Sequence, residues 1–281
     1  MAATQASFRT ARHATALLLL AAGLFTAAHW FRQRRPAAVA RPRRVVSDRR
    51  ARRCAPRGPA QPDAAGDPIT VVGWNIGLDD AAIGAIAERI GVFAGVDLWS
   101  IAEVNCTNAV SALEAAAEEE EVGDFGAVLG PSGGGMRLVA LYDDTRFDLL
   151  EWFELTDINT TGNARAPLVL HLRDTVSGAQ FLFMVNHLYR SRDDERHTQA
   201  QMLREWAEGK TLPVIAVGDY NFDWEAEGGE RAHDAGYDLT TEGGAWQWVR
   251  PASLVTSQCS GWPCRYDSVL DFVFTAGPAR G

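Results

Sequence analysis

The sequence predicts an α/β fold in which β-sheets are covered by helices, beginning near Ile69 and continuing to the C-terminus. Short runs of β-branched and apolar residues recur after Pro68, and helical patterns lie between several of them. The chain has 281 residues, 47% of them hydrophobic, which is enough to bury a substantial core. No internal repeat is evident.

Seven apolar runs are typical of buried strands, because each is short and rich in Val, Ile, Leu or Phe. In chain order they are ITVVGWNI, VDLWSIAEV, MRLVALY, APLVLHL, FLFMVNHL, LPVIAVGDY and SVLDFVF. Helical patterns are expected chiefly over residues 80–93, 107–121 and 193–208. In the last of these, Ala200, Leu203 and Ala207 fall on one stripe, as in a helix that packs on a sheet.

Residues 1–31 are predicted to be a signal peptide or a membrane anchor. Residues 14–31 contain no charged side chain other than a histidine, and two arginines precede them. Three arginines follow immediately, which favours keeping the downstream side in the cytoplasm. We expect a periplasmic, extracellular or membrane-anchored protein, with a cytoplasm-facing anchor or a start codon assigned too far upstream as alternatives.

Residues 32–67 are predicted to be a disordered linker, because Arg, Pro and Ala dominate and large apolar side chains are few. Residues 1–66 contain 13 arginines and only two acidic residues, so they carry +11 of a net charge of −9, and the rest carries −20. The domain over residues 68–281 therefore lacks the broad basic face that binds duplex nucleic acid non-specifically. A local basic groove remains compatible with this charge.

Cys259 and Cys264 lie close together, with Gly261 and Pro263 between them to turn the chain. A local disulfide in an oxidising compartment is expected, and two free thiols are the alternative. No second pair of Cys or His completes a four-ligand zinc set.

Several predicted strands end in polar residues that a simple core strand does not need. The residues are Asn75, Glu103, Asn186 with His187, Asp219 with Asn221, and Asp271. Polar groups at strand ends are how α/β folds assemble a site. Taken singly, each also suits a turn, a salt bridge or a satisfied structural position, so the hypothesis of a site depends on their ordered coincidence.

In this order the motifs resemble the endonuclease/exonuclease/phosphatase superfamily, which includes pancreatic-type deoxyribonucleases, abasic-site endonucleases, sphingomyelinases and inositol-polyphosphate phosphatases. The resemblance covers Ile69 to Pro278. The segment NARAPLVL is similar to the family's Arg-bearing strand, and RHTQAQML is similar to its R-x-x-Q-A-x-x-L helix. The resemblance implies a deoxyribonuclease I-like, four-layer sandwich of two packed β-sheets flanked by helices.

The resemblance also implies a site for Mg²⁺ or Mn²⁺. Glu103 is a hard oxygen ligand of the kind these ions prefer, and Asn75 would assist at the metal or the phosphate. By resemblance Asp219 orients or deprotonates the attacking water, and Asn221 donates to a phosphate oxygen. Alternation across Tyr220 would place both side chains on one face if this segment stays extended.

Three other groups are expected around the substrate. His187 matches the family's strand-end histidine, which can stabilise charge or donate a proton. Arg165 and Arg190 could each contact the substrate phosphate, with Arg165 better supported by its position in the family. By resemblance Asp271 supports a histidine that arrives later, in a Ser-Asp-His motif.

This chain ends at Gly281 without that motif, so we expect a domain missing its last strand: a fragment, a domain completed by another chain, or an impaired enzyme. The predicted function is a Mg²⁺- or Mn²⁺-dependent phosphodiesterase that uses water as the nucleophile. The alternatives are a phospholipid phosphodiesterase, possible at a membrane through the N-terminal segment, and a binding protein that keeps the fold without hydrolysis. The same core handles nucleic acids, sphingolipids and inositol phosphates, so the substrate class stays open.

Overall fold

The protein is described as a computed structural model that covers residues 4–8, 19–20, 68–77, 83–105, 107–119, 123–258 and 268–279. The predicted linker, most of the predicted N-terminal leader, and both cysteines of the predicted disulfide lie outside these residues. Those three predictions are therefore not tested by the structure.

The described residues form twelve strands and four α-helices, with short 3-10 turns between some of them. The strands are β1 (Thr4–Phe8), β2 (Leu19–Leu20), β3 (Ile69–Asn75), β4 (Leu98–Val104), β5 (Phe125–Leu129), β6 (Arg137–Asp143), β7 (Phe147–Glu154), β8 (Leu168–Asp174), β9 (Gln180–His187), β10 (Val214–Glu225), β11 (Trp246–Trp248) and β12 (Ser268–Ala276). The helices are α1 (Ile83–Ile90), α2 (Thr107–Ala117), α3 (Asp193–Glu208) and α4 (Ala235–Thr241).

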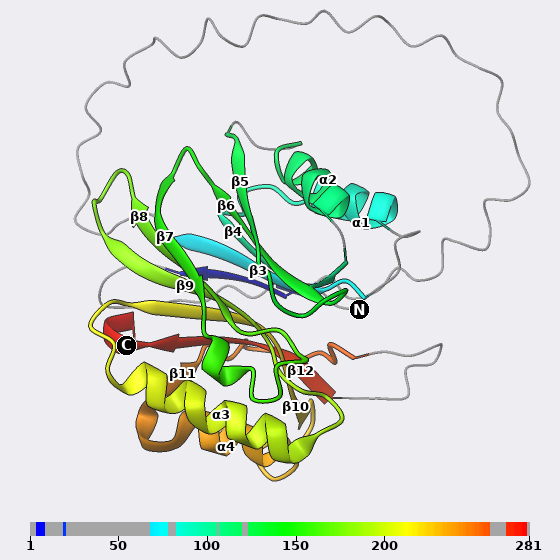
Figure 1. Ribbon diagram of the computed structural model, residues 1–281, viewed down its shortest axis with the longest axis vertical. Coiled ribbons are helices and arrows are strands. Elements are labelled where there is room, and N and C mark those ends of the chain that lie inside the picture. Colours follow the sequence, from blue (N-terminus) through cyan, green and yellow to red (C-terminus); the bar gives the residue numbers. More distant parts are fainter. Residues whose placement is uncertain are drawn as a thin grey trace, which may run out of the picture.

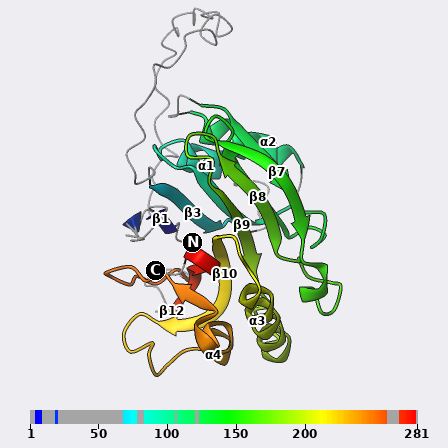
Figure 2. The same ribbon diagram turned by 90° about the vertical axis from the view of Figure 1, so that its left-hand side faces the viewer.

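The strands form two sheets that pack face to face, and helices cover both outer faces. The first sheet has the order β2-β1-β3-β4-β6-β5, and the second has the order β11-β12-β10-β9-β8-β7. Figure 1 shows α1 and α2 above the first sheet and α3 and α4 below the second. The same succession of layers is visible from the side in Figure 2. This is a four-layer α/β sandwich, so the predicted fold class is confirmed.

Three hydrophobic clusters correspond to the three interfaces between layers. Between the sheets, Val71 and Leu98 pack with Phe183, Val217 and other apolar residues. A second cluster joins the first sheet to α1 and α2, and a third joins the second sheet to α3 and α4. The hydroxyl of buried Ser100 donates to the Val217 carbonyl at 2.8 Å, so a hydrogen bond also links the sheets at their centre.

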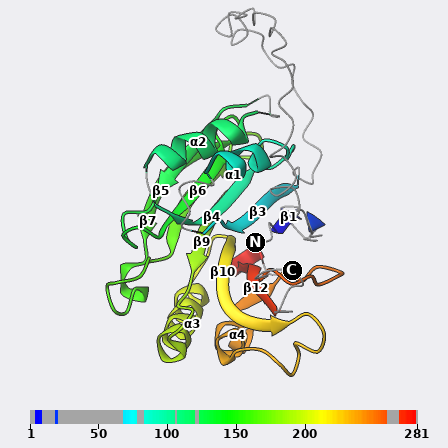
Figure 3. The same cartoon turned by 90° about the vertical axis from the view of Figure 1, so that its right-hand side faces the viewer.

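Each sheet contains one parallel pair, and these pairs decide where polar strand ends meet. β3 is parallel to β4, and β9 is parallel to β10, with the other pairs antiparallel. Because the carboxyl ends of parallel strands lie at one edge of a sheet, the residues that end β3 and β4 are neighbours. The same holds for β9 and the middle of β10, the long curved strand in Figure 3.

All seven predicted strands and the three predicted helices are present, with the helices shorter than expected in two cases. The sequence did not predict β1, β2, β5, β7, β11 or α4. In β7 the register shifts between Leu149 and Glu151, and Leu150 and Trp152 are exposed. This irregularity on an edge strand removes the alternating pattern by which a strand is recognised.

The outer edge of β3 is paired with β1, in antiparallel register from Thr4 opposite Gly73 to Phe8 opposite Ile69. In the described part of the chain β3 is therefore an interior strand of its sheet. No helix of that part is long and apolar enough to cross a membrane.

Candidate active site

The last residue but one of β4 leaves the regular strand conformation. Glu103 has a φ of 64°, in the left-handed region that non-glycine residues rarely occupy, and the register between β4 and β6 shifts between Ile101 and Val104. A bulge of this kind re-aims a side chain, and strained backbone is concentrated at functional sites. The carboxylate of Glu103 is about one-fifth exposed, so it lies at the edge of the core and not inside it.

Asn75 connects the two sheets through its side-chain amide. It ends β3, and its Nδ2 donates to Glu103 Oε1 at 3.1 Å and to Asp219 Oδ2 at 3.0 Å. Its Oδ1 accepts from the backbone N–H of Gly77 at 3.1 Å, which fixes the orientation of the amide. Asn75 is therefore the donor that joins a carboxylate of the first sheet to a carboxylate of the second.

His187 and Asp219 occupy paired positions of β9 and β10 in the second sheet. His187 Nε2 lies 3.7 Å from Glu103 Oε1 and 3.6 Å from Asp219 Oδ2, so it faces both carboxylates but is too far for a hydrogen bond to either. Four predicted site residues, from four strands and both sheets, thus gather at one place.

Gly218 is required for this approach of β9 to β10. Its φ is 152°, and a Cβ at this position would lie 1.9 Å from the carbonyl oxygen of Asn186. Only glycine lets the backbone come this close, which places Asp219 directly beside His187.

Burial sets the protonation of Asp219 and His187. It raises the pKa of the Asp219 carboxyl to about 6, although hydrogen bonds from Asn75 and the Asn221 backbone act in the opposite direction. Burial, together with the nearby charges of Arg165 and Arg190, lowers the pKa of the His187 imidazole well below its ordinary value. At neutral pH His187 is uncharged, so it is suited to hydrogen bonding and not to an ion pair.

Asn221 follows Asp219 within β10, at a point where the strand is irregular. Its φ is 53°, its backbone N–H donates to Asp219 Oδ1 at 3.0 Å, and β10 is irregular against β12 from Asp219 to Trp224. The segment from Asp219 to Asn221 is therefore not extended. The expected alternation across Tyr220 does not explain where the side chains of Asp219 and Asn221 lie. Asn221 Nδ2 donates to the Leu188 carbonyl at 3.1 Å, which holds the side chain in place.

The two predicted phosphate-binding arginines lie at different depths. Arg165 is partly buried, its Nε donates to the His187 carbonyl at 3.1 Å, and burial lowers the pKa of its guanidinium against the raising effect of Glu103 and Asp219. Arg190 is exposed, and its Nη1 donates to Asn221 Oδ1 at 3.3 Å. Within the described residues neither guanidinium forms an ion pair with a carboxylate, so both retain donors for an anion.

Asp271 lies on β12, opposite Asp219 in the register of the second sheet. It is buried, and its Oδ1 has no hydrogen-bond partner among the described residues. Burial raises the pKa of its carboxyl well above the ordinary value, and the charge of Asp219 raises it further. A buried polar atom without a partner is rare in proteins and calls for a physical explanation.

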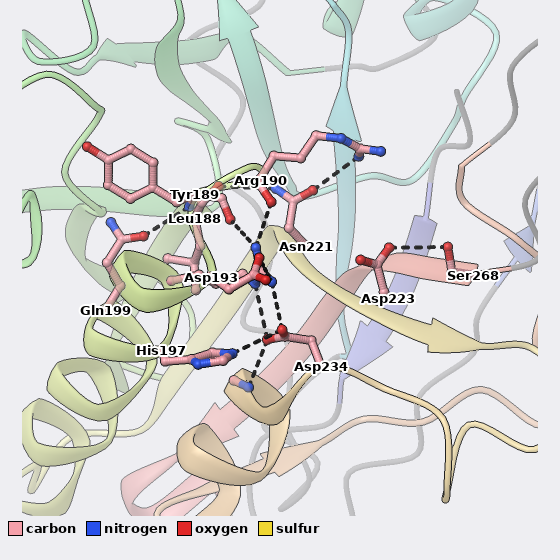
Figure 4. A network of polar contacts seen from close by, with 12 residues as sticks. Leu188, Tyr189, Arg190, Asp193, His197, Gln199, Asn221, Asp223, Asp234 and Ser268 are labelled. Carbon is pink, nitrogen blue, oxygen red and sulfur yellow. Dashed lines mark hydrogen bonds and ion pairs between the residues drawn. The ribbon is translucent and has the colours of Figure 1, made fainter.

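Asp234 is not indicated by the sequence as a site residue, and it lies beside the site on the approach to α4. Its carboxylate caps α4 by accepting from the Gly236 N–H at 2.8 Å, and its own N–H donates to the Phe222 carbonyl on β10 at 2.7 Å. It also accepts from Arg196 of α3, and Figure 4 shows His197 of the same helix beside it. An Asp before a short helix is a recognisable cap signal, but a cap alone does not indicate a role at a site.

The donor set at the strand ends suits a divalent cation of the Mg²⁺ type. In the described residues no group of three or more His, Cys, Asp and Glu side chains forms a complete metal cage. Mg²⁺ does not need one, since it is held by one or two carboxylates together with water and substrate phosphate. Glu103 is partly exposed, and Asp219 is buried where its negative charge is unfavourable. The pair fits this requirement, because a cation would compensate the charge of both carboxylates.

Comparisons with known proteins concern the same part of the chain. The sequence profile described as "Endonuclease/Exonuclease/phosphatase family" matches residues 72–280. No curated protein sequence matches the chain significantly.

Solved structures of this kind share the fold. An endonuclease/exonuclease/phosphatase family protein of Bacteroides thetaiotaomicron has a TM-score of 0.56 at 18% identity, covering 74% of this chain and 81% of its own. The mannosyl-6-phosphatase of Bacteroides thetaiotaomicron VPI-5482 has a TM-score of 0.56 at 17% identity, covering 75% and 86%. TDP2 of D. rerio, complexed with a single strand DNA product, has a TM-score of 0.55 at 18% identity, covering 74% and 83%.

Proposed function

The chain belongs to the endonuclease/exonuclease/phosphatase family, and on this premise we propose that it is a divalent-metal-dependent phosphodiesterase. The observation that carries the proposal is the convergence of Asn75, Glu103, His187 and Asp219 from four strands of two sheets. The amide of Asn75 donates to both carboxylates. Four residues with separate structural roles would not need such a shared donor.

Asp219 is proposed to orient the attacking water and accept its proton. A pKa of about 6 is suited to a general base, because the group is ionised at neutral pH and still basic enough to take a proton. Its Oδ2 is held by Asn75 and its Oδ1 by the Asn221 N–H, so the carboxylate is fixed before substrate arrives. Water adds to phosphorus as Asp219 accepts its proton, and one P–O ester bond breaks. The leaving oxygen takes up a proton from solvent, and Asp219 releases its proton to solvent.

The donors of the site are proposed to stabilise the negative charge that develops on the phosphate oxygens. Arg165 and Arg190 have guanidinium groups without carboxylate partners in the described part of the chain, and His187 is a neutral imidazole. Donors that are already in position act strongly, because they need not reorganise during the reaction. Enzymes of this family generally use divalent metal ions. An ion held at Glu103 would supply a Lewis acid for a phosphate oxygen.

A second candidate is a protein that binds phosphoesters without turning them over. It is favoured by Asp271, whose buried Oδ1 lacks a hydrogen-bond partner within the described residues. In a site with all its hydrogen-bond donors in place, we would expect a donor to contact this oxygen of Asp271. The two candidates differ in turnover and agree in binding.

The test is a substrate panel with the full chain. DNA, RNA, a phosphocholine lipid, a bis-aryl phosphodiester and an aryl phosphomonoester are each incubated with Mg²⁺, with Mn²⁺ or with chelator. We expect hydrolysis of a diester that depends on the metal and is lost in Glu103→Gln. Turnover confined to the lipid would assign the enzyme to phospholipids, and turnover confined to the monoester would make it a phosphatase. Binding of a substrate without any turnover would favour the second candidate.

A further inference from the structure

Arg196, on the first turns of α3, has a buried side chain that serves three parts of the structure at once. Its Nε donates to Asp234 Oδ1 at 3.1 Å and its Nη2 donates to Asp234 Oδ2 at 2.6 Å, so the two side chains form a bidentate pair. Asp193 contacts the same Nη2 at 2.8 Å from the solvent side. Only 3% of the Arg196 side chain is exposed. A guanidinium buried to this degree without a carboxylate partner would destabilise the fold.

The remaining donor of Arg196 holds the backbone that follows β9. Its Nη1 donates to the carbonyl of Tyr189 at 3.0 Å and to that of Arg190 at 2.7 Å. Gln199, one turn later on α3, accepts from the Tyr189 N–H at 3.0 Å. Both backbone polar groups of Tyr189 are therefore held by side chains of α3, and Figure 4 shows the contact between Gln199 and Tyr189.

The fastened segment is the one that carries Arg190 to the site. Arg190 Nη1 donates to Asn221 Oδ1 at 3.3 Å, and the side-chain amide of Gln258, with its oxygen turned toward the guanidinium, accepts from the same group. Two residues before Arg190, the Leu188 N–H donates to the Asp219 carbonyl at 3.0 Å. Arg190 is thus held at its backbone by Arg196 and at its guanidinium by Asn221.

Asp234 connects Arg196 to β10. Its N–H donates to the carbonyl of Phe222, the residue after Asn221, and His197 Nε2 lies 3.0 Å from its Oδ2. The ion pair of Arg196 and Asp234 therefore joins the two backbone segments that present Arg190 and Asn221. Among the described residues, neither Arg196 nor Asp234 contacts Asn75, Glu103, His187 or Asp219, so neither acts on the reacting atoms directly.

We propose that Arg196 and Asp234 are positioning residues for phosphate binding, because they hold the backbone of Tyr189 and Arg190 so that Arg190 and Asn221 form one anion-binding corner. The inference deepens the proposed function and rests on it for the identity of the anion as a substrate phosphate. A lysine at position 196 keeps the charge but has a single ammonium group, which cannot reproduce the bidentate pair and the two carbonyl contacts together. Arg196→Lys is therefore expected to weaken the corner without leaving Asp234 uncompensated.

The test is a double-mutant cycle on the full chain with inorganic phosphate as the probe. Its affinity is measured by calorimetry in the presence of Mn²⁺ for the parent, Arg190→Ala, Arg196→Lys and the double variant. We expect each single variant to bind phosphate roughly tenfold more weakly and the double variant to be no weaker than Arg190→Ala. With the bis-aryl diester, Arg196→Lys should raise KM more than it lowers kcat.

Two further variants keep the test sharp. Arg204→Lys, on the same helix, changes an arginine whose partners are Glu205, Glu208 and Glu242, and it should leave phosphate affinity unchanged. Asp234→Asn keeps the hydrogen-bond acceptor and the helix cap, so it replaces Arg196→Lys in the cycle if circular dichroism shows that the lysine variant is unfolded.

The inference is overturned if phosphate affinity is unchanged in Arg196→Lys, or if the losses in Arg190→Ala and Arg196→Lys are additive, because additivity indicates a general structural role. It is also overturned if the parent does not bind phosphate. A parent that binds phosphate and shows the expected coupling, but hydrolyses no ester, would refute the proposed function and leave the positioning role standing.

Discussion

Asp219 and Asp271 lie opposite each other on β10 and β12, and both carboxyl groups are buried at the edge where the two sheets meet. Burial raises the pKa of Asp219 to about 6 and that of Asp271 well above its ordinary value, with the charge of Asp219 as the second cause for Asp271. In the metal-free protein the carboxyl groups of Asp219 and Asp271 therefore stay protonated to a higher pH than they do in the unfolded chain. Their ionisation at neutral pH lowers the free energy of unfolding.

The pH dependence of this effect gives a first prediction, made for Asp219→Asn. A raised pKa in the folded state means that the contribution of Asp219 to stability is fully present below its unfolded pKa and is lost as pH rises through about 6. The asparagine variant has no such loss. With chelator present, it should exceed the parent in free energy of unfolding by on the order of 2 kcal/mol at pH 7.5, and by less at pH 4.5. Urea titrations at the two pH values measure the difference, and equal stability at pH 7.5 would show that the buried carboxylate is not destabilising.

Metal binding gives a second prediction, made for Glu103→Gln. The amide keeps the shape of the side chain and removes the charge that attracts a hard cation, so Mn²⁺ affinity should fall by roughly tenfold or more. Calorimetry with Mn²⁺ is the measurement. Glu205→Gln is the matched control, since this carboxylate is exposed on α3. Similar affinity in the parent and in Glu103→Gln would remove Glu103 as a ligand.

The close approach of β9 and β10 gives a third prediction, made for Gly218→Ala. An added Cβ would meet the Asn186 carbonyl oxygen at 1.9 Å in a backbone conformation that alanine rarely adopts, so the strands must separate. The free energy of unfolding should fall by roughly 3 kcal/mol, and turnover should fall with it because His187 and Asp219 are displaced. Thermal denaturation and the diester assay check both effects.

Gly84→Ala is the control for this substitution. Gly84 lies in α1, and nothing lies within 4 Å of the position that a Cβ would take. Alanine there should be neutral or stabilise the protein by about 0.5 to 1 kcal/mol. If Gly218→Ala behaved like Gly84→Ala, the argument from close approach would be wrong.

Much of the site could be predicted because its signals are local. Asn75, Glu103, His187 and Asp219 each interrupt or end a short apolar run, and a polar residue at such a position is visible in the sequence alone. Parallel pairing then brings these strand ends together, which is a general property of α/β sheets. The roles of the individual residues remain predictions.

The backbone of the site could not be predicted in this way. Glu103 and Asn221 have φ values of 64° and 53°, which neither residue type indicates in the sequence. The surrounding packing imposes these conformations, so they depend on the folded structure. The same reason applies to Arg196 and Asp234, whose partnership spans 38 residues and has no spacing rule.

The most direct measurement of the central claim is the turnover of the bis-aryl phosphodiester by Asp219→Asn in the presence of Mn²⁺. We expect a loss of roughly 10²- to 10⁴-fold in kcat, because the group that orients and deprotonates water is removed. Circular dichroism in the same buffer with Mn²⁺ checks that the variant is folded, so that unfolding does not explain the loss. Parent-like turnover in folded Asp219→Asn would contradict the assignment of the reaction to this site.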